Sequence, residues 1–432
     1  MKKKIISSIV ITSLMLLNSC SLLQKGPYEP FKSGHGFSLI EEGYSVPVTA
    51  QSDALCWACS GATAMQYNLM LTRGIDDEID IDYLSLLAFS GDAESGTEGN
   101  YSNNLQLAGG HQIMVIEAAS SHDINGCILV EADDLSSADT EVLQDRIRNN
   151  GALTALIVPD SDQFESIQEN ATYNVPNAEF RLTHHMVTVV GWDDDYPADT
   201  FDPPAASNGA WLIQDSQGTD FGDEGFYWIS YDTPLYGVCD YILSDEYTEV
   251  LSYEAGVQAV AVTEGETAVA NVFDHEGTIG AIGTYTTGSD QTLTVEIYDG
   301  EFGDLICTKE QTFEYIGYHT IELDEPIDVG RYTVVVRFPE GAPVEGSSIE
   351  TDLSPLGGDY VGTVRGFYAS IEEGQSYIYL DGEWVDMSTD GIADQMDFSC
   401  ETRETLMGLT YRDRATITEA PNNACIKVLY IA

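Results

Sequence analysis

Apolar residues recur at helical spacing in the first half of the chain. From Cys56 to Arg73 they stand three or four positions apart, and Gly74 follows directly. This spacing predicts a helix that ends at a glycine cap. Thr140 to Asn150 has the pattern of a second helix, and apolar runs of strand length lie at 152–158, 186–192, 210–213 and 225–231. The region of about 39–245 is therefore predicted to mix helices with strands.

The pattern changes at about residue 250. Helical spacing disappears, and short apolar stretches alternate with turn residues at 256–262, 292–298, 331–338 and 376–380. Asp381-Gly382 reads as a hairpin turn after the last of these stretches. The region 250–432 is therefore predicted to be an antiparallel β-sandwich.

The first twenty residues have the layout of a secretory signal. Three lysines follow the initial Met, and the apolar run after them is too short for a confident membrane span. The run ends in Leu17-Asn18-Ser19-Cys20, which resembles the lipobox of bacterial lipoproteins. That resemblance implies a signal peptide over 1–20, lipidation of Cys20 and an exported protein held at the cell surface by its lipid. Residues 21–38 are predicted to be a polar linker.

Length, charge and cysteines narrow the class of protein. A chain of 432 residues suggests two domains. Asp and Glu number 72 against 17 Lys and Arg, a net charge of -55, which disfavours nucleic acid and anionic lipid as partners. Acidic runs such as 76–82 are typical of solvated surface, with calcium binding as the alternative. The eight cysteines lack the spacing of a disulfide scaffold or a zinc site, so neither a metal nor a cofactor is predicted.

Three residues carry candidate chemistry. Cys56 opens the predicted helix, where peptide dipoles and unpaired N–H groups favour a thiolate. His185 stands directly before an apolar strand, a position from which an imidazole can serve a thiol as base. Asp215 ends another apolar strand and can accept the histidine Nδ1–H bond, which fixes the tautomer. Each has a plainer interpretation when taken alone: a buried inert cysteine, a histidine in a satisfied network and a turn-capping aspartate.

Taken together and in this order, the three segments resemble the papain family of cysteine peptidases. Cys56-Trp-Ala matches that family's nucleophile segment, His185 matches the histidine before a strand ending in Val-Gly-Trp, and Asp215-Ser-Gln-Gly stands at its Asn-Ser-Trp-Gly. The separations from Cys56 are 129 and 159 residues. The resemblance covers 39–245 and implies an α+β papain-like fold, in which a helical half and a β-rich half meet at a substrate cleft. It also implies a Cys56–His185–Asp215 triad.

The chain departs from the papain pattern at three positions. The family's oxyanion-hole glutamine lies six residues before the nucleophile, whereas Gln51 lies five before Cys56. Asp215 replaces the usual Asn, and Gln217 replaces the tryptophan that normally shields the His–Asn bond. Gln51 is still predicted to serve the oxyanion hole.

The region after 250 resembles the lectin-like domain that follows the peptidase in some bacterial members of the family. The matching segments are 270–273, 317–320, 374–377 and 425–427. Aromatic side chains there could face a sugar, although core positions are the plainer interpretation. The candidates are Tyr315, Tyr318, Tyr377, Tyr379 and Trp384.

These observations predict a cell-surface cysteine peptidase that hydrolyses peptide bonds. Its partners would be a protein or peptide substrate, and a glycan at the second domain, with the membrane contacted only through the lipid on Cys20. Two alternatives stay open. One is a catalytically degenerate adhesin, and the other is a cell-wall peptide amidase or acyl transferase that uses the same thiol chemistry.

Overall fold

The structure is a computed structural model of the 432-residue chain. It describes residues 29–32, 34–52, 54–90, 110–179, 184–254, 260–262, 265–346, 348–352, 363–368, 370–392, 395, 415–417 and 421–432. The signal segment and Cys20 lie outside these residues. No helix among those described has the length and apolar character needed to cross a membrane.

The first part mixes helices and strands, as predicted. Its helices are α1 Cys56–Arg73, α2 Ile81–Ser90, α4 Gln112–Ser121, α5 Thr140–Asn150, α6 Ser161–Asn170 and the short 3₁₀ helix η1 Ala198–Thr200. Its strands are β1 Gly36–Ser38, β2 Ile128–Asp133, β3 Leu153–Ile157, β4 Thr172–Tyr173, β5 His185–Asp193, β6 Ala210–Gln214, β7 Phe226–Ser230, β8 Tyr236–Cys239, β9 Ile242–Ser244 and β10 Glu249–Leu251. One sheet runs in the order β4-β7-β6-β5-β3-β8, with β1 paired to β5.

The second part consists of strands in the residues described. These are β11 Val260–Val262, β12 Thr267–Tyr285, β13 Gln291–Asp299, β14 Leu305–Phe313, β15 Gly317–Phe338, β16 Pro343–Gly346, β17 Ser348–Asp352, β18 Thr363–Tyr368, β19 Ser376–Leu380, β20 Glu383–Asp386, β21 Ala415–Ile417, β22 Pro421–Ala424 and β23 Lys427–Ile431. The large sheet is built around β12, β15 and β23, and its pairs are antiparallel. Asp381 and Gly382 both have positive φ, 50° and 92°, which is the backbone of the predicted hairpin turn between β19 and β20.

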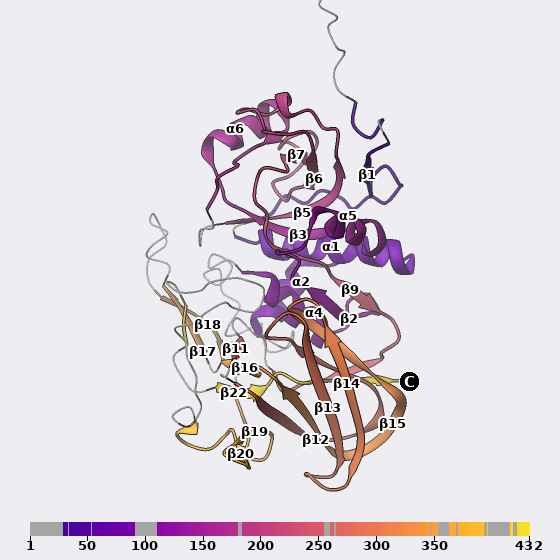
Figure 1. The fold of residues 1–432 in the computed structure, drawn as a ribbon, viewed down its shortest axis with the longest axis vertical. Coiled ribbons are helices and arrows are strands. Elements are labelled where there is room, and N and C mark those ends of the chain that lie inside the picture. The colour runs from indigo at the N-terminus through magenta and orange to yellow at the C-terminus, as the bar shows by residue number, and fades with distance from the viewer. Residues whose placement is uncertain are drawn as a thin grey trace, which may run out of the picture.

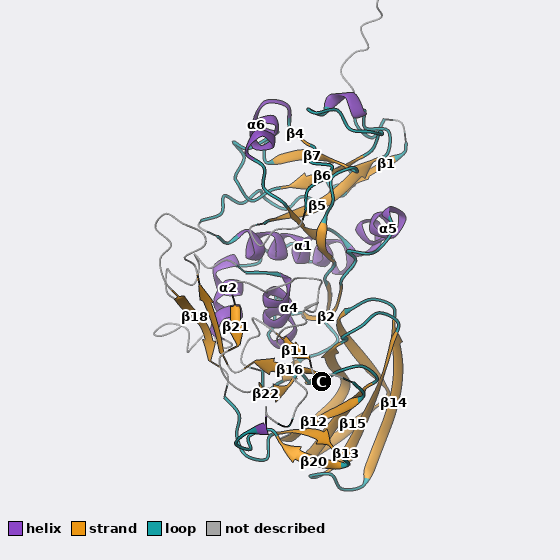
Figure 2. Ribbon diagram, turned by 60° about the vertical axis from the view of Figure 1, so that its left-hand side comes forward, coloured by secondary structure: helices purple, strands orange, loops and turns teal. Residues whose placement is uncertain are grey.

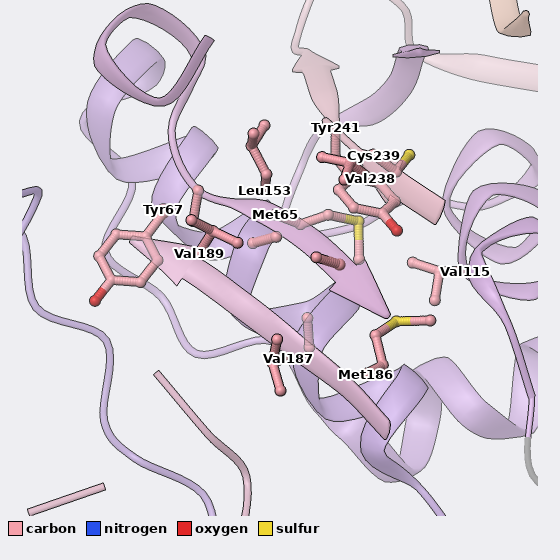
Figure 3. Packing of buried hydrophobic residues seen from close by; sticks show 14 of the residues in the cluster. Met65, Tyr67, Val115, Leu153, Met186, Val187, Val189, Val238, Cys239 and Tyr241 are labelled. Atoms are coloured by element: carbon pink, nitrogen blue, oxygen red, sulfur yellow. The ribbon is translucent and has the colours of Figure 1, made fainter. Parts of the chain in front are cut away.

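Helix α1 is the centre of the first part. It lies between the β3–β5 layer and the helices α2 and α4 (Figures 1 and 2), and its side chains from Trp57 to Leu69 are buried. Met65 belongs to one core cluster with Val115 of α4 and Met186 of β5 (Figure 3). Gly61 allows α4 to approach, because a Cβ there would lie 2.7 Å from Val115. The predicted helix from Cys56 to Arg73 with its cap at Gly74 is confirmed.

At two places the strand pairing of the structure crosses the boundaries predicted between the linker and the two domains. Residues 36–38, which close the predicted linker, form β1 and pair with β5, and the Phe31 N–H donates to Asp193 over 2.7 Å. β2 and β9 belong to the large sheet of the second part, because Gly317 to His319 at the start of β15 pair with β2. Backbone pairing between distant segments decides both, and local sequence patterns do not report it.

Buried charges link the two parts. Lys427 of β23 is buried and bonds to Glu117 of α4 over 2.7 Å and to Glu254. The second Glu117 oxygen accepts the Tyr285 hydroxyl over 2.6 Å. Burial opposes the charged ammonium, but the two carboxylates outweigh it and raise the pKa of Lys427. Lys427 is therefore a cation held in the core between α4 and the second sheet.

Candidate active site

Cys56 is the first residue of α1, with its side chain half-buried. The first N–H groups of a helix have no partner within the helix, and they favour a negative charge at this end. His185 and the backbone of Met186 lie close enough to the thiol to act on its ionisation. Burial opposes ionisation of the thiol, but the hydrogen bond and charge of His185 outweigh it, so the pKa of Cys56 lies below its ordinary value.

His185 is the first residue of β5, where it pairs with Ile157 of β3. Its side chain is buried, and its Nε2 lies 3.0 and 3.1 Å from the two carboxylate oxygens of Asp215. The sequence-based assignment of the Nδ1–H to Asp215 is therefore wrong. Because β5 presents the ring with Nε2 toward Asp215, Nδ1 is the nitrogen left for the thiol.

Asp215 follows β6 directly and is 2% exposed. Its Oδ1 accepts the Gln217 backbone N–H over 3.1 Å, and its Oδ2 accepts the Tyr227 hydroxyl over 2.8 Å. Burial acts to raise the pKa of this carboxyl, but the charge and hydrogen bond of His185 hold it below its usual range. Asp215 in turn outweighs the burial of the imidazole and raises the pKa of His185 to about 10.

The pKa shifts of Cys56, His185 and Asp215 describe one charge distribution. A thiol with a lowered pKa, an imidazole with a raised pKa and an ionised carboxylate form a thiolate–imidazolium–carboxylate row. In such a row the thiolate form of the sulfur is favoured, and a proton stays on the imidazole beside it. The structure thus brings Cys56, His185 and Asp215 together from α1, β5 and the end of β6.

Gln51 contacts Ser216, the residue directly after Asp215. Its backbone N–H donates to the Ser216 carbonyl over 2.7 Å, and its side-chain Oε1 accepts the Ser216 hydroxyl over 2.5 Å. It also lines a pocket of about 510 Å³ together with Leu55 and Cys59. The contact with Ser216 places Gln51 beside the Asp215 segment in spite of its shifted spacing from Cys56.

Two family profiles match parts of the chain. The profile of the papain family cysteine protease matches residues 118–245, and that of the lectin like domain matches 252–399. The chain contains a papain-family cysteine protease domain. A lectin-like domain follows it, and the protein is an enzyme of the cysteine-peptidase type. The matched protease residues include His185 and Asp215 but begin after Cys56, so the geometry alone places the candidate nucleophile.

Two solved structures resemble the whole chain. One is the clostridial cysteine protease Cwp84 after propeptide cleavage, 18% identical with a TM-score of 0.66, over 92% of this chain and 99% of that one. The other contains the cysteine protease and lectin-like domains of Cwp84, a surface layer associated protein of Clostridium difficile, again 18% identical with a TM-score of 0.66, over 93% and 90%. A comparison with curated proteins finds no match. The predicted fold class, a papain-like domain followed by a β-sandwich domain, is confirmed.

The residues described contain no group of three or more His, Cys, Asp or Glu side chains placed to hold a metal ion. Thiolate chemistry draws on groups of the kind that Cys56, His185 and Asp215 carry. Peptide hydrolysis by a thiolate needs only these groups and water.

Sequence reasoning missed Tyr227 of β7. This residue lies opposite Ile213 of β6, is 1% exposed and donates its hydroxyl to Asp215. An Asn in place of Asp215 would carry an NH2 group on one side, whereas a carboxylate has a second acceptor that must be satisfied when buried. The signal was present, because an aspartate at an asparagine position calls for an extra donor. Only the pairing of β6 with β7 identifies which residue supplies it.

Tyr227→Phe should weaken catalysis through Asp215. Without the hydroxyl the buried carboxylate loses a hydrogen bond worth about 1.5–3 kcal/mol. The pKa of Asp215 then rises, its hold on the imidazolium weakens and the pKa of His185 falls. The alkaline limb of activity should therefore move to lower pH by about half to one unit, with turnover reduced roughly tenfold. A pH profile of kcat measures both effects.

The matched control is Tyr231→Phe. The Tyr231 hydroxyl bonds to Asp194 over 2.8 Å and contacts Gln144, away from the triad. This variant should keep the wild-type pH profile. If Tyr227→Phe also keeps it, Tyr227 has no positioning role.

Proposed function

We propose that the protein hydrolyses peptide bonds through a Cys56–His185–Asp215 triad. The observation that carries this proposal is the row from the thiol through the buried imidazole to the carboxylate, in which His185 bonds to Asp215 and lowers the pKa of the thiol. Its two ends are held from different elements, the sulfur by the start of α1 and the carboxylate by the end of β6. That arrangement holds the imidazole between sulfur and carboxylate, as a nucleophile and its base require.

The reaction follows from these positions. The Cys56 sulfur attacks the carbonyl carbon, and the oxyanion is met by the Cys56 backbone N–H and the Gln51 amide. His185 then gives its proton to the departing amine nitrogen, and a thioester remains on Cys56. Neutral His185 next takes a proton from water, whose oxygen attacks the thioester. Loss of the acid product restores the thiolate–imidazolium pair.

The alternatives from the sequence differ in what they require of the triad. An adhesin needs no oriented imidazole, so the buried His185–Asp215 pair favours an enzyme. A cell-wall amidase or acyl transferase would use the same groups, and it differs only in substrate and acceptor. Release of fragments from purified peptidoglycan, measured beside peptide cleavage, separates those two activities.

Substitutions in the triad test the proposal on a peptide library. Cys56→Ala should remove hydrolysis altogether, and Asp215→Ala should reduce turnover by roughly 100-fold or more, because the imidazole loses its orientation. Asp215→Asn keeps the shape but removes the negative charge, so the pKa of His185 falls from about 10. This variant should stay within about tenfold of wild type, with its alkaline limb at lower pH.

The proposal fails if Asp215→Ala and Asp215→Asn both match wild type across the pH range. Circular dichroism of each variant shows whether a loss of activity reflects chemistry or unfolding. If the wild-type protein cleaves no peptide in the library, the amidase alternative replaces the proposal of peptide hydrolysis.

We further propose that the protein is exported and held at the bacterial cell surface through lipid on Cys20. The lipobox-like Leu17–Cys20 segment supports this, as does the likeness to a surface layer associated protein. A fatty-acid analogue fed to the expressing cells should label wild type and not Cys20→Ser. Equal labelling of both proteins would mean that the lipid is attached at a residue other than Cys20.

Glycan binding by the lectin-like domain is supported at one group of aromatic residues. Tyr318 is fully buried and cannot face a sugar. Trp384 stacks on Phe302 with ring centroids 4.9 Å apart and meets Tyr379 edge-on, and Tyr379 is 39% exposed. Trp384→Ala and Tyr379→Ala should therefore weaken any binding to a glycan array. Binding that survives both substitutions would place the contact on another surface.

A further inference from the structure

A second cysteine stands one helical turn after the nucleophile. Cys59 is 2% exposed and has a free thiol, and the proposed mechanism does not use it. Burial, followed by the nearby Cys56, raises the pKa of Cys59 to about 12, so the two sulfur groups are close enough to repel when charged. Cys56 is a potential thiolate and Cys59 a protonated thiol, two different roles on one turn of helix.

Helix geometry brings this pair within reach of a disulfide. Residues three apart on an α-helix have Cα atoms about 5 Å apart, inside the range of about 4.4–6.8 Å found for disulfides. Helical side chains lean toward the N-terminus, so Cys59 leans toward Cys56. Their Cβ atoms, about 5–6 Å apart on a regular helix, have to approach by roughly 1 Å.

The start of α1 can supply that movement. Cys56 is the first helical residue, and its N–H lies outside the helical hydrogen-bond ladder. Leu55 before it makes no side-chain capping bond. The Cys59 N–H donates to the Leu55 carbonyl over 3.0 Å, so this bond ties Cys59 to the residue before Cys56. A closure would therefore move the Cys56 side chain, at the open end of the turn, toward Cys59.

A pocket borders this turn of the helix on the side of Cys59. Cys59 lines the pocket of about 510 Å³ that also contains Leu55, Gln51 and Ser52. Among the residues described, Cys127, Cys239 and Cys425 are buried elsewhere, and Cys307 on β14 of the lectin-like domain is half-buried. Cys307 is thus the appropriate comparison for a thiol that is reachable but far from the triad.

We propose that Cys56 and Cys59 form a reversible disulfide that protects the nucleophile against peroxide. This inference rests on the proposed role of Cys56 as the reactive thiolate. The Cys56 thiolate attacks a peroxide oxygen, the O–O bond breaks, and with one proton a sulfenic acid and water form. The Cys59 sulfur then bonds to the Cys56 sulfur, and the sulfenic hydroxyl leaves as water with the Cys59 proton. Two electrons have passed from the cysteine pair to the peroxide.

The disulfide removes the nucleophile from the triad and spares it from further oxidation. Its sulfur is no longer available to His185, so the enzyme is inactive. A dithiol reverses the bond by thiol–disulfide exchange and is itself oxidised. A protein without Cys59 has no second thiol beside the sulfenic acid, and more peroxide carries it to the sulfinic acid, which a dithiol does not reduce.

The test treats the purified full-length chain with hydrogen peroxide and then with dithiothreitol. Two measurements follow each step: peptide hydrolysis, and alkylation of Cys56 by iodoacetamide read by mass spectrometry. After peroxide the wild type should lose both peptide hydrolysis and alkylation of Cys56. The mass of its peptide spanning 56–59 should fall by two hydrogens. Dithiothreitol should return both to within about twofold of the untreated values.

Cys59→Ala supplies the comparison, and Cys307→Ser the matched control. Untreated Cys59→Ala should hydrolyse peptide within about twofold of wild type, but after peroxide it should stay inactive in dithiothreitol and gain two oxygens on Cys56. Cys307→Ser should behave as wild type. Recovery of Cys59→Ala to the wild-type extent, or recovery of wild type without the two-hydrogen loss, would overturn the proposal. If the untreated chain cleaves no peptide, the proposed function fails, while mass and alkylation still decide whether the pair exists.

Discussion

The carboxylate of Asp215 lies almost out of reach of water, and a charge in that position has to be met by protein groups. His185 meets it with a cation, while Tyr227 and the Gln217 backbone N–H meet it with hydrogen bonds. The imidazolium in turn needs a negative partner on its other side, and the Cys56 thiolate supplies one. Ionisation of the Cys56 thiol therefore depends, through His185, on a carboxylate with which it shares no hydrogen bond.

An aspartate at this position makes the row more strongly charged than an asparagine would. With an amide the imidazolium has one anion beside it, the thiolate, whereas here it has two. This explains why the pKa of His185 rises to about 10 in spite of burial. The second carboxylate oxygen needs a donor, which the Tyr227 hydroxyl supplies.

The protease and lectin-like domains share one buried framework. Lys427 reaches from β23 to Glu117 on α4, and Arg146 of α5 bonds to Asp133 over 2.7 Å and to Asp240 over 2.9 Å, where β2 joins β15. Removal of one partner from such groups leaves an uncompensated buried charge. Helix α4 packs on α1 through Gly61 and Val115, so the second domain supports the helix that begins at Cys56.

The sequence by itself determined the elements whose signals are local. Apolar spacing and Gly74 define α1, and the Asp381-Gly382 turn defines a hairpin, because helices and tight turns depend on neighbouring residues. The sequence also showed that Cys56, His185 and Asp215 follow one another in the order of the papain pattern. Only the tertiary structure decided which nitrogen of His185 faces Asp215, and that the Tyr227 hydroxyl is a further hydrogen-bond donor to Asp215. It also decided that β1, β2 and β9 pair with strands distant in the sequence. These features depend on strand pairing and side-chain approach across long separations, for which no local pattern exists.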